Sequence, residues 1–170
     1  LPFFFLALGN DNRESCGDFK GLGDAIHIIG VDPASHKATI LNVPRDTQAP
    51  GGDKINAYYS LGGLGGIVAQ LNQMVGIQIQ YAVTTNFCQF QQMVDEIGGT
   101  DVNVKVPMHD TDSGSNFNPG VQHMTGYDAL AFSRDRHSLL AGDIDRTGNQ
   151  AVVILAALSK LRAQNTGDAG

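Results

Sequence analysis

The sequence predicts an α/β domain in which helices cover both faces of a sheet. Two patterns carry this prediction. Short β-branched runs such as Ala25–Val31 and Lys37–Val43 are typical of strands, and Leu64, Ile67, Val68, Leu71 and Val75 recur at helical spacing. Strands and helices that follow one another in this way indicate a layered domain. The length of 170 residues suits a single domain spanning residues 1–170.

The first half of the chain is expected to open with a buried strand, Phe3–Gly9, followed by a polar, glycine-rich loop. Ala25–Val31 and Lys37–Val43 then form a hairpin around the Asp-Pro turn at Asp32. His27 lies inside an apolar strand and is interpreted as a core histidine. A helix over Leu61–Gly76, weakened by its glycines, and a strand over Ile79–Thr85 follow.

The second half begins with an amphipathic helix from Phe87 that Gly98 and Gly99 end. Thr100–Pro107 alternates apolar and polar residues and predicts a strand, whereas His109–Gly120 is interpreted as a polar loop. Thr125 and Asp128 form a capping-box pattern ahead of a short helix. A long helix over Asp143–Ala163 completes the chain, with Val153, Ile154, Ala157, Leu158 and Leu161 on one face.

Composition excludes several classes of function. A net charge of −6 argues against general nucleic-acid binding, which needs a basic face. No apolar run reaches the roughly 18 residues that cross a bilayer, and Leu1–Gly9 resembles a buried strand more than a signal peptide. The sequence contains no P-loop, no GxSxG and no HExxH motif. His109, His123 and His137 show no metal-ligand spacing.

The two cysteines, Cys16 and Cys88, belong to no CxxC pair, so a zinc site is not expected. A disulfide between them would close a loop of about 72 residues and stabilise the fold by roughly 4 kcal/mol. The sequence leaves open whether they form this bond or remain free thiols.

Three arginines, Arg134, Arg136 and Arg146, fall within a short span, in a chain with only 16% charged residues. Guanidinium groups match phosphate oxygens bidentately, so the cluster predicts a phosphate or diphosphate ligand. Gln150 lies four residues after Arg146 and shares its helix face. The alternative is a set of surface salt bridges with Asp135, Asp143 and Asp145.

Two aspartates are placed to bind a metal. Asp11 follows the first strand and Asp24 precedes the second, so both lie at strand ends, where open α/β sheets bind ligands. Two carboxylates there predict a Mg²⁺ site completed by substrate phosphates. The alternative for either residue is a turn or capping role. Arg45 comes just after a strand that Pro44 ends, and a core strand gains nothing from an arginine there, so a group outside the strand is expected to need this guanidinium.

Seven motifs, in order across nearly the whole chain, resemble the LytR-CpsA-Psr family of bacterial cell-wall enzymes. They are LGNDNR (Leu8–Arg13), GDAIHIIGVDP (Gly23–Pro33), NVPRDT (Asn42–Thr47), DKINAYYSLGG (Asp53–Gly63), VDEIGGTDVNV (Val94–Val104), MTGYDALAFSRDR (Met124–Arg136) and DIDRTGNQ (Asp143–Gln150).

The resemblance implies a three-layer α-β-α sandwich with a central mixed sheet, held at the extracytoplasmic face of the bacterial membrane by an N-terminal helix. It implies transfer of a glycan phosphate from a polyprenyl-pyrophosphate-linked donor to a hydroxyl of peptidoglycan. Polyprenyl phosphate is released. Teichoic acid is one polymer of this kind, and the two cysteines resemble actinobacterial members, which implies arabinogalactan.

The resemblance also assigns residues. Asp11 and Asp24 match the Mg²⁺-associated aspartates, with Mn²⁺ as an alternative ion. The pyrophosphate-binding set comprises Arg45, Lys54, Arg134, Arg136, Arg146 and Gln150, and the catalytic roles fall to Arg45, Arg134 and Asp11. Arg13 matches a family arginine with a less defined role. This chain departs from the family pattern at two places, each of which lacks one cationic residue. It has Leu22-Gly23-Asp24-Ala25 where the family often has Arg-Ser-Asp-Thr, and Asn149-Gln150 where the family often has Arg-Gln.

A polyprenyl chain also needs an apolar groove. Candidate wall residues are Ile67, Leu71, Val75, Val83, Phe87, Phe90, Met93 and Val94, for which the alternative is ordinary core packing. Two other functions stay open on the sequence: a non-catalytic receptor for lipid phosphates, and a pyrophosphohydrolase in which water replaces the sugar acceptor. The paired aspartates favour the two catalytic functions over the receptor.

Overall fold

The computed structural model describes residues 1–12, 16–17 and 21–167 of the chain. It forms two compact units, Leu1–Cys88 and Gln89–Gly170. Each unit contains its own cluster of buried apolar side chains. The prediction that residues 1–170 act as one domain stays a prediction.

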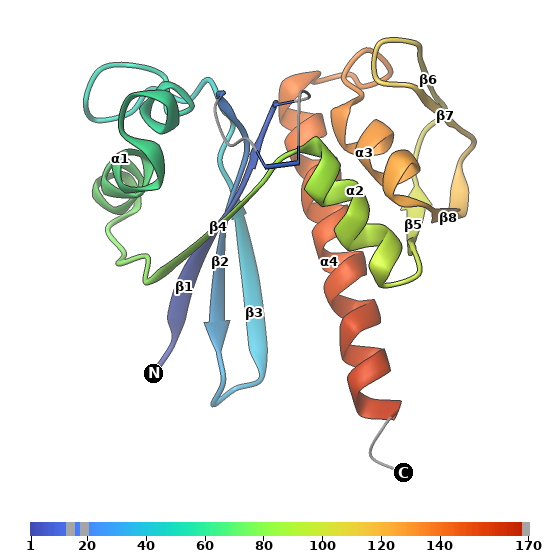
Figure 1. Cartoon of the computed structure of the whole chain (residues 1–170), viewed down its shortest axis with the longest axis horizontal. Coiled ribbons are helices and arrows are strands. Elements are labelled where there is room, and N and C mark those ends of the chain that lie inside the picture. The colour runs from blue at the N-terminus through green and yellow to red at the C-terminus, as the bar shows by residue number, and fades with distance from the viewer. Residues whose placement is uncertain (13–15, 18–20, 168–170) are drawn as a thin grey trace. The chain divides into compact units, whose positions relative to one another are not determined.

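The first unit contains a four-stranded sheet in the order β3-β2-β1-β4 (Figure 1). β1 (Phe3–Asn10) pairs antiparallel with β2 (Gly23–Asp32), which pairs antiparallel with β3 (Lys37–Asn42). β4 (Tyr81–Thr85) runs parallel to β1. The sheet is therefore mixed, and the predicted α/β class with a central mixed sheet is confirmed.

The turn between β2 and β3 forms as the sequence predicts. The carboxylate of Asp32 accepts hydrogen bonds from Ala34 N at 3.1 Å and from Ser35 Oγ at 2.6 Å. His36 completes the turn with a φ of 54°. His27 is buried in β2, and its Nδ1 lies 2.9 Å from Oδ1 of Asn42 on β3. The interpretation of His27 as a core histidine is confirmed.

One face of the sheet packs against α1 (Ala57–Val75). Ile67 and Leu71 of the helix are fully buried with Leu6 and Ile28 of the strands. The helix begins four residues before the predicted start at Leu61. It is broken within its first half, because Gly63 has a φ of 59° and a ψ of −153°, which are not helical angles.

A disulfide joins Cys16 to Cys88, whose Cα atoms lie 5.1 Å apart. It resolves the alternative that the sequence left open in favour of the bonded pair. Cys88 lies at the start of α2 (Phe87–Glu96). Gly98 and Gly99 follow with φ values of 76° and 74°, so glycine ends this helix as predicted.

Four short strands form two ladders in the second unit. β5 (Thr100–Val104) pairs antiparallel with β8 (Gly120–Met124), and β6 (Met108–Asp110) pairs antiparallel with β7 (Ser115–Phe117). The prediction of a polar loop over His109–Gly120 is wrong, because this segment contains a hairpin. Asp110 and Ser115 are buried polar residues, and they hide the alternating pattern that would reveal the strands.

α3 (Gly126–Arg134) and α4 (Asp143–Gly167) lie beside each other in the second unit (Figure 1). Thr125 caps α3 through the predicted capping box with Asp128. The core includes Val102 of β5 and Val153 of α4, and the rings of Phe117 and Phe132 meet edge to face at 6.1 Å. None of the described helices has the length and apolar character needed to cross a bilayer.

Candidate functional site

The loop that follows β3 holds Arg45 at the end of the sheet. Thr47 N donates to Pro44 O at 3.0 Å, and Asn56 N donates to Arg45 O at 3.3 Å. Ile55 N donates to Thr47 O at 2.8 Å, which closes the loop on itself. These backbone bonds fix the arginine just past the strand, as the sequence predicts.

Asp24 and Arg45, which the sequence assigns to a metal and to a diphosphate, are in direct contact. Nη1 of Arg45 lies 3.0 Å from Oδ1 of Asp24, and both side chains are about one-fifth exposed. Asp24 belongs to β2, next to the register shift between Gly9 and Asn10 on β1. The first unit therefore brings these two predicted site residues together.

Asp11 directly follows β1 at the same end of the sheet. Its Oδ1 accepts a hydrogen bond from Leu22 N at 3.2 Å. Gly21 has a φ of 131°, and a Cβ there would lie only 2.6 Å from Oδ1 of Asp11. A glycine at position 21 thus leaves room for this carboxylate.

These residues fit a Mg²⁺ site. Carboxylate oxygens are the ligands that Mg²⁺ takes from proteins, usually one or two, with phosphates and water as the others. The guanidinium of Arg45 contacts Oδ1 of Asp24, and an ionised carboxylate still offers further lone pairs. Asp11 and Asp24 would hold the ion.

Lys54 and Asp46 form a second pair beside Arg45. Nζ of Lys54 lies 2.6 Å from Oδ1 of Asp46, and Nε of Arg45 lies 3.8 Å from Oδ2 of the same carboxylate. Asp46 therefore links the two predicted cationic residues of this unit. This geometry is consistent with Asp46 orienting Arg45.

In the second unit, Arg146 lies in the first turns of α4 and is buried. Its Nη2 lies 2.5 Å from Oδ1 of Asp143, three residues earlier on the helix. Nε2 of Gln150 donates to Ser133 O at 3.3 Å, next to Arg134 at the end of α3. Arg146 and Gln150 thus lie where α4 meets the end of α3.

The sequence left open that the arginines of this region pair with Asp135, Asp143 and Asp145. Only one of these aspartates makes such a pair among the described contacts. Asp143 pairs with Arg146 as that alternative predicts. Asp135 instead accepts hydrogen bonds from Ser115 Oγ at 2.5 Å and from Ser138 N at 3.0 Å. Asp145 accepts one from Ala141 N at 2.9 Å.

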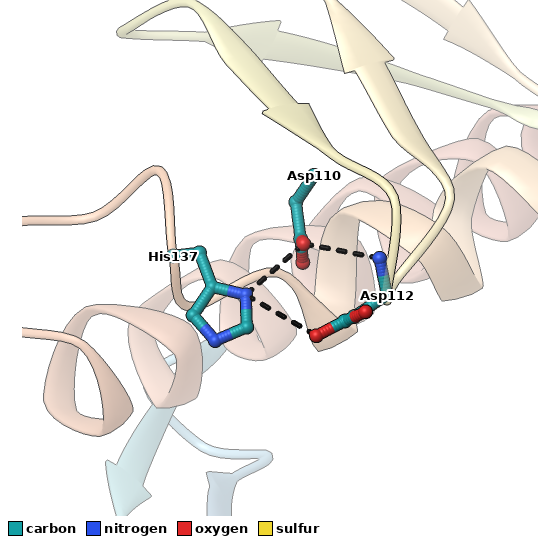
Figure 2. A group of neighbouring side chains, drawn as sticks. All are labelled: Asp110, Asp112 and His137. Carbon is teal, nitrogen blue, oxygen red and sulfur yellow. Dashed lines mark hydrogen bonds and ion pairs between the residues drawn. The ribbon is translucent and has the colours of Figure 1, made fainter.

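Figure 2 shows a group that sequence analysis missed, in which His137 lies beside Asp110 and Asp112. Nδ1 of His137 is 3.0 Å from Oδ1 of Asp110 and 3.8 Å from Oδ2 of Asp112. Their ligand atoms all lie within 4.8 Å of one another. Spacing along the chain gave no signal, because the β6–β7 hairpin brings these residues together.

Hydrogen bonding shifts both ionisable partners of this pair. Burial raises the pKa of Asp110, but the hydrogen bonds from His137, Ser113 and Asp112 outweigh burial and lower this pKa to about 2. The hydrogen bond to Asp110, together with the charge of that carboxylate, raises the pKa of His137. Each shift favours the charged form of its own group.

The predicted lipid-groove residues differ in their surroundings. Ile67 and Leu71 are fully buried in the core of the first unit, with Val75 packed against it. Val94 is buried in the core of the second unit, with Phe90 packed against it. Val83 and Met93 are 52% and 51% exposed, and Phe87 begins α2. The groove stays a prediction.

Arg13 lies outside the described residues. Arg136 follows α3 and is exposed, one residue after the buried Asp135. No described contact tests whether Arg45 of the first unit and Arg146 of the second serve one ligand, so that prediction stands as made.

Residues 2–166 match the LytR_cpsA_psr family. This chain is a member of that family. The resemblance drawn from the seven sequence motifs is thereby confirmed.

Relatives of this chain include teichoic acid transferases. The chain is 34% identical over 164 residues to the polyisoprenyl-teichoic acid–peptidoglycan teichoic acid transferase TagU of Bacillus mycoides strain KBAB4, covering 94% of this chain and 52% of that protein. The chain thus spans about half the length of this relative.

Two solved structures resemble this LytR-CpsA-Psr chain closely. The crystal structure of Bacillus subtilis TagV has a TM-score of 0.81 at 31% identity and covers 94% of this chain and 64% of its own. A structure of TagT bound to LIIa-WTA has a TM-score of 0.82 at 27% identity, and the match covers 94% of this chain and 63% of the TagT chain. The fold assignment therefore agrees with structures of the family.

Proposed function

We propose that this chain is the catalytic part of a glycopolymer–peptidoglycan phosphotransferase. It moves a glycan phosphate from a polyprenyl-pyrophosphate-linked donor to a hydroxyl of peptidoglycan. The observation that carries the proposal is the contact between Arg45 and Asp24 at the end of the sheet, 3.0 Å long, with Asp11 at the same end. The named transferases among its relatives support the proposal.

In the proposed reaction, the acceptor hydroxyl oxygen attacks the glycan-side phosphorus. The bond from that phosphorus to the bridging oxygen breaks, and polyprenyl phosphate leaves with the electron pair. The hydroxyl proton passes to a base that we do not assign. Transfer of this kind needs positioning and charge neutralisation more than covalent participation by the protein.

Cationic side chains would supply most of that neutralisation. Arg45 and Lys54 would contribute from the first unit, and Arg134, Arg136 and Arg146 from the second, with the neutral amide of Gln150 as a hydrogen-bond donor. Held by its loop and by Asp24, Arg45 is already oriented before a ligand binds. Bound by Asp11 and Asp24, Mg²⁺ or Mn²⁺ would neutralise charge on the phosphate oxygens.

The finer parts of the proposal concern location and polymer. A disulfide is typical of proteins outside the cytoplasm, which supports action at the extracytoplasmic face of a bacterial membrane. There we expect an N-terminal anchor in the full-length protein. Teichoic acid is the donor polymer of the named relatives and is the first to test, with arabinogalactan as the second.

The test is an incubation of the chain with Mg²⁺, a polyprenyl-pyrophosphate-linked glycan and peptidoglycan, followed by identification of the products. Glycan coupled to peptidoglycan supports the transferase. Free glycan phosphate would indicate a hydrolase, and an unchanged but bound donor would indicate a receptor. Either of those results contradicts the proposal.

A second arm tests the metal. We expect chelation of Mg²⁺, and separately Asp11→Asn, to suppress turnover, with activity restored to the chelated wild type by added Mg²⁺. Turnover at the wild-type rate in the presence of chelator would remove the role assigned to Asp11 and Asp24.

A further inference from the structure

The β6–β7 hairpin contacts the segment that carries two of the predicted arginines, Arg134–Ser138, here termed the arginine segment. His109 N of the hairpin donates to Ser138 Oγ at 3.0 Å, and Nη2 of Arg134 donates to Asp112 O at 3.4 Å. Two side chains of the segment are thus held by backbone groups of the hairpin.

Two carboxylates join the hairpin to the arginine segment, one from each side. Asp135 of the segment is fully buried and accepts a hydrogen bond from Ser115 Oγ of β7. Asp110 of β6 is also buried and accepts one from His137 of the segment, as Figure 2 shows. The hairpin and the segment therefore each supply one buried carboxylate and one side chain that hydrogen-bonds the carboxylate of the other.

Each carboxylate is also fixed within its own element. Asp110 accepts hydrogen bonds from Asp112 N at 3.1 Å and Ser113 N at 3.2 Å, both in the turn of the hairpin. Asp135 accepts one from Ser138 N at 3.0 Å. Buried carboxylates satisfied in this way have one favourable orientation, because every lost donor leaves charge uncompensated.

The consequence falls on Arg134 and Arg136. These two residues flank Asp135, and His137 follows directly, so the anchored side chains alternate along the chain with the cationic ones. Anchoring the side chains at positions 135, 137 and 138 to the hairpin restricts where both guanidinium groups can reach. A free loop at this place would let them sample many positions, few of which match the geometry of the transition state.

We propose that the β6–β7 hairpin positions Arg134 and Arg136. The contact between the exposed side chain of His137 and the buried Asp110 is one of the interactions that hold the arginine segment to the hairpin. The proposal rests on the function proposed above for the reaction, but the positioning itself is a property of the free protein. His137 and Asp110 are positioning residues, since they act through the arginines.

The test replaces His137, whose side chain is 57% exposed and so is not needed for the core. In His137→Ala the contact to Asp110 is lost. In His137→Asn an amide N–H takes roughly the place of Nδ1 and can still donate. The chain offers a matched control, His123→Ala, since His123 makes a similar contact to Asp101 at 2.8 Å between β8 and β5.

Transfer kinetics give the first readout. We expect His137→Ala to lower kcat by about tenfold or more, because small displacements of positioned groups are costly in the transition state. KM should stay within about twofold. His137→Asn should restore most of kcat, and His123→Ala should leave it unchanged. Equal kcat values for His137→Ala and His123→Ala would overturn the proposal.

A second readout does not depend on activity. The side-chain Nε–Hε group of Arg134 is followed by ¹⁵N relaxation in the full chain, with the signal assigned by its loss in Arg134→Lys. We expect faster, larger-amplitude motion in His137→Ala and wild-type behaviour in His137→Asn. An unchanged order parameter in His137→Ala refutes positioning, whereas absence of transfer by the wild type refutes only the proposed function.

Discussion

At the residue scale, the first unit brings together side chains that are distant along the chain. Asp24 and Arg45 lie 3.0 Å apart, and Asp46 contacts both Arg45 and Lys54. Their places at strand ends were predictable, because turn residues and Pro44 mark where each strand stops. The partner of each charge was not predictable, since pairing depends on the strand register.

Arg45→Ala should lower turnover of the diphosphate lipid by at least about two orders of magnitude. Loss of one charge-assisted contact in the transition state costs about 3 kcal/mol. Folding should change little, because the side chain is partly exposed. Initial rates of transfer check this, with Lys37→Ala at the opposite end of β3 as the control.

Arg134→Ala tests the same assignment in the second unit. We expect a loss of similar size, again with little change in the unfolding temperature. Near-normal turnover in both arginine variants would contradict the assigned pyrophosphate-binding set.

At the element scale, strands with apolar alternation were predictable and the short polar strands were not. β1, β2 and β3 contain β-branched or aromatic runs that the structure confirms. β6 and β7 have three residues each and bury Asp110 and Ser115, so their pattern resembles a loop. β8 buries only Met124 and forms through its pairing with β5.

The two glycines at positions 63 and 65 of α1 should respond oppositely to alanine. Gly63 has a φ of 59° and a ψ of −153°, a conformation almost restricted to glycine, so Gly63→Ala should lower the free energy of unfolding by about 1–3 kcal/mol. A Cβ at Gly65 meets no atom within 4 Å, and Gly65→Ala should raise that free energy by up to about 1 kcal/mol. Urea unfolding measures both, and equal effects would contradict the break in the helix.

The hairpin should make stability depend on pH in a defined window. The pKa of Asp110 falls from 3.8 to about 2 on folding. Its stabilising contribution to the free energy of unfolding is therefore present above about pH 3.8 and is lost as the pH falls towards 2. The hydrogen bond to Asp110 and the charge of that carboxylate raise the pKa of His137 from 6.5, with Asp112 adding to the effect and Arg136 opposing it. The stabilising contribution of His137 to the free energy of unfolding is fully present below pH 6.5. It is lost as the pH rises through the pKa that His137 has in the folded protein.

Thermal unfolding of wild type and His137→Ala at a series of pH values checks this window. The difference in unfolding temperature should be largest between about pH 4 and pH 6.5 and shrink on either side. A difference that does not vary with pH would show that the ion pair contributes nothing to folding.

At the scale of the whole molecule, seven ordered motifs were enough to predict the family, which the match over residues 2–166 confirms. The patterns of strands and helices predicted the α/β class, which the mixed sheet confirms. Each motif has only a few residues, but seven such motifs are not expected to occur in the family's order by chance. The disulfide was not predictable in the same way. Two cysteines fit equally well as free thiols until the fold places their Cα atoms 5.1 Å apart.

Replacing both cysteines by serine should lower the free energy of unfolding by roughly 4 kcal/mol, as expected for closing a loop of this length. Denaturant unfolding of the double variant and of the oxidised wild type gives the difference. Thiol titration of the unfolded, unreduced wild type should detect no free thiol, and two thiols per chain would refute the bond.

The covalent link between Cys16 and Cys88 also determines how this chain behaves after limited proteolysis. A single cleavage anywhere between the two positions yields two polypeptides that still migrate together on a denaturing gel. They separate only once a reductant is added. After one such cut, the sheet and the first helix would stay tethered in this way.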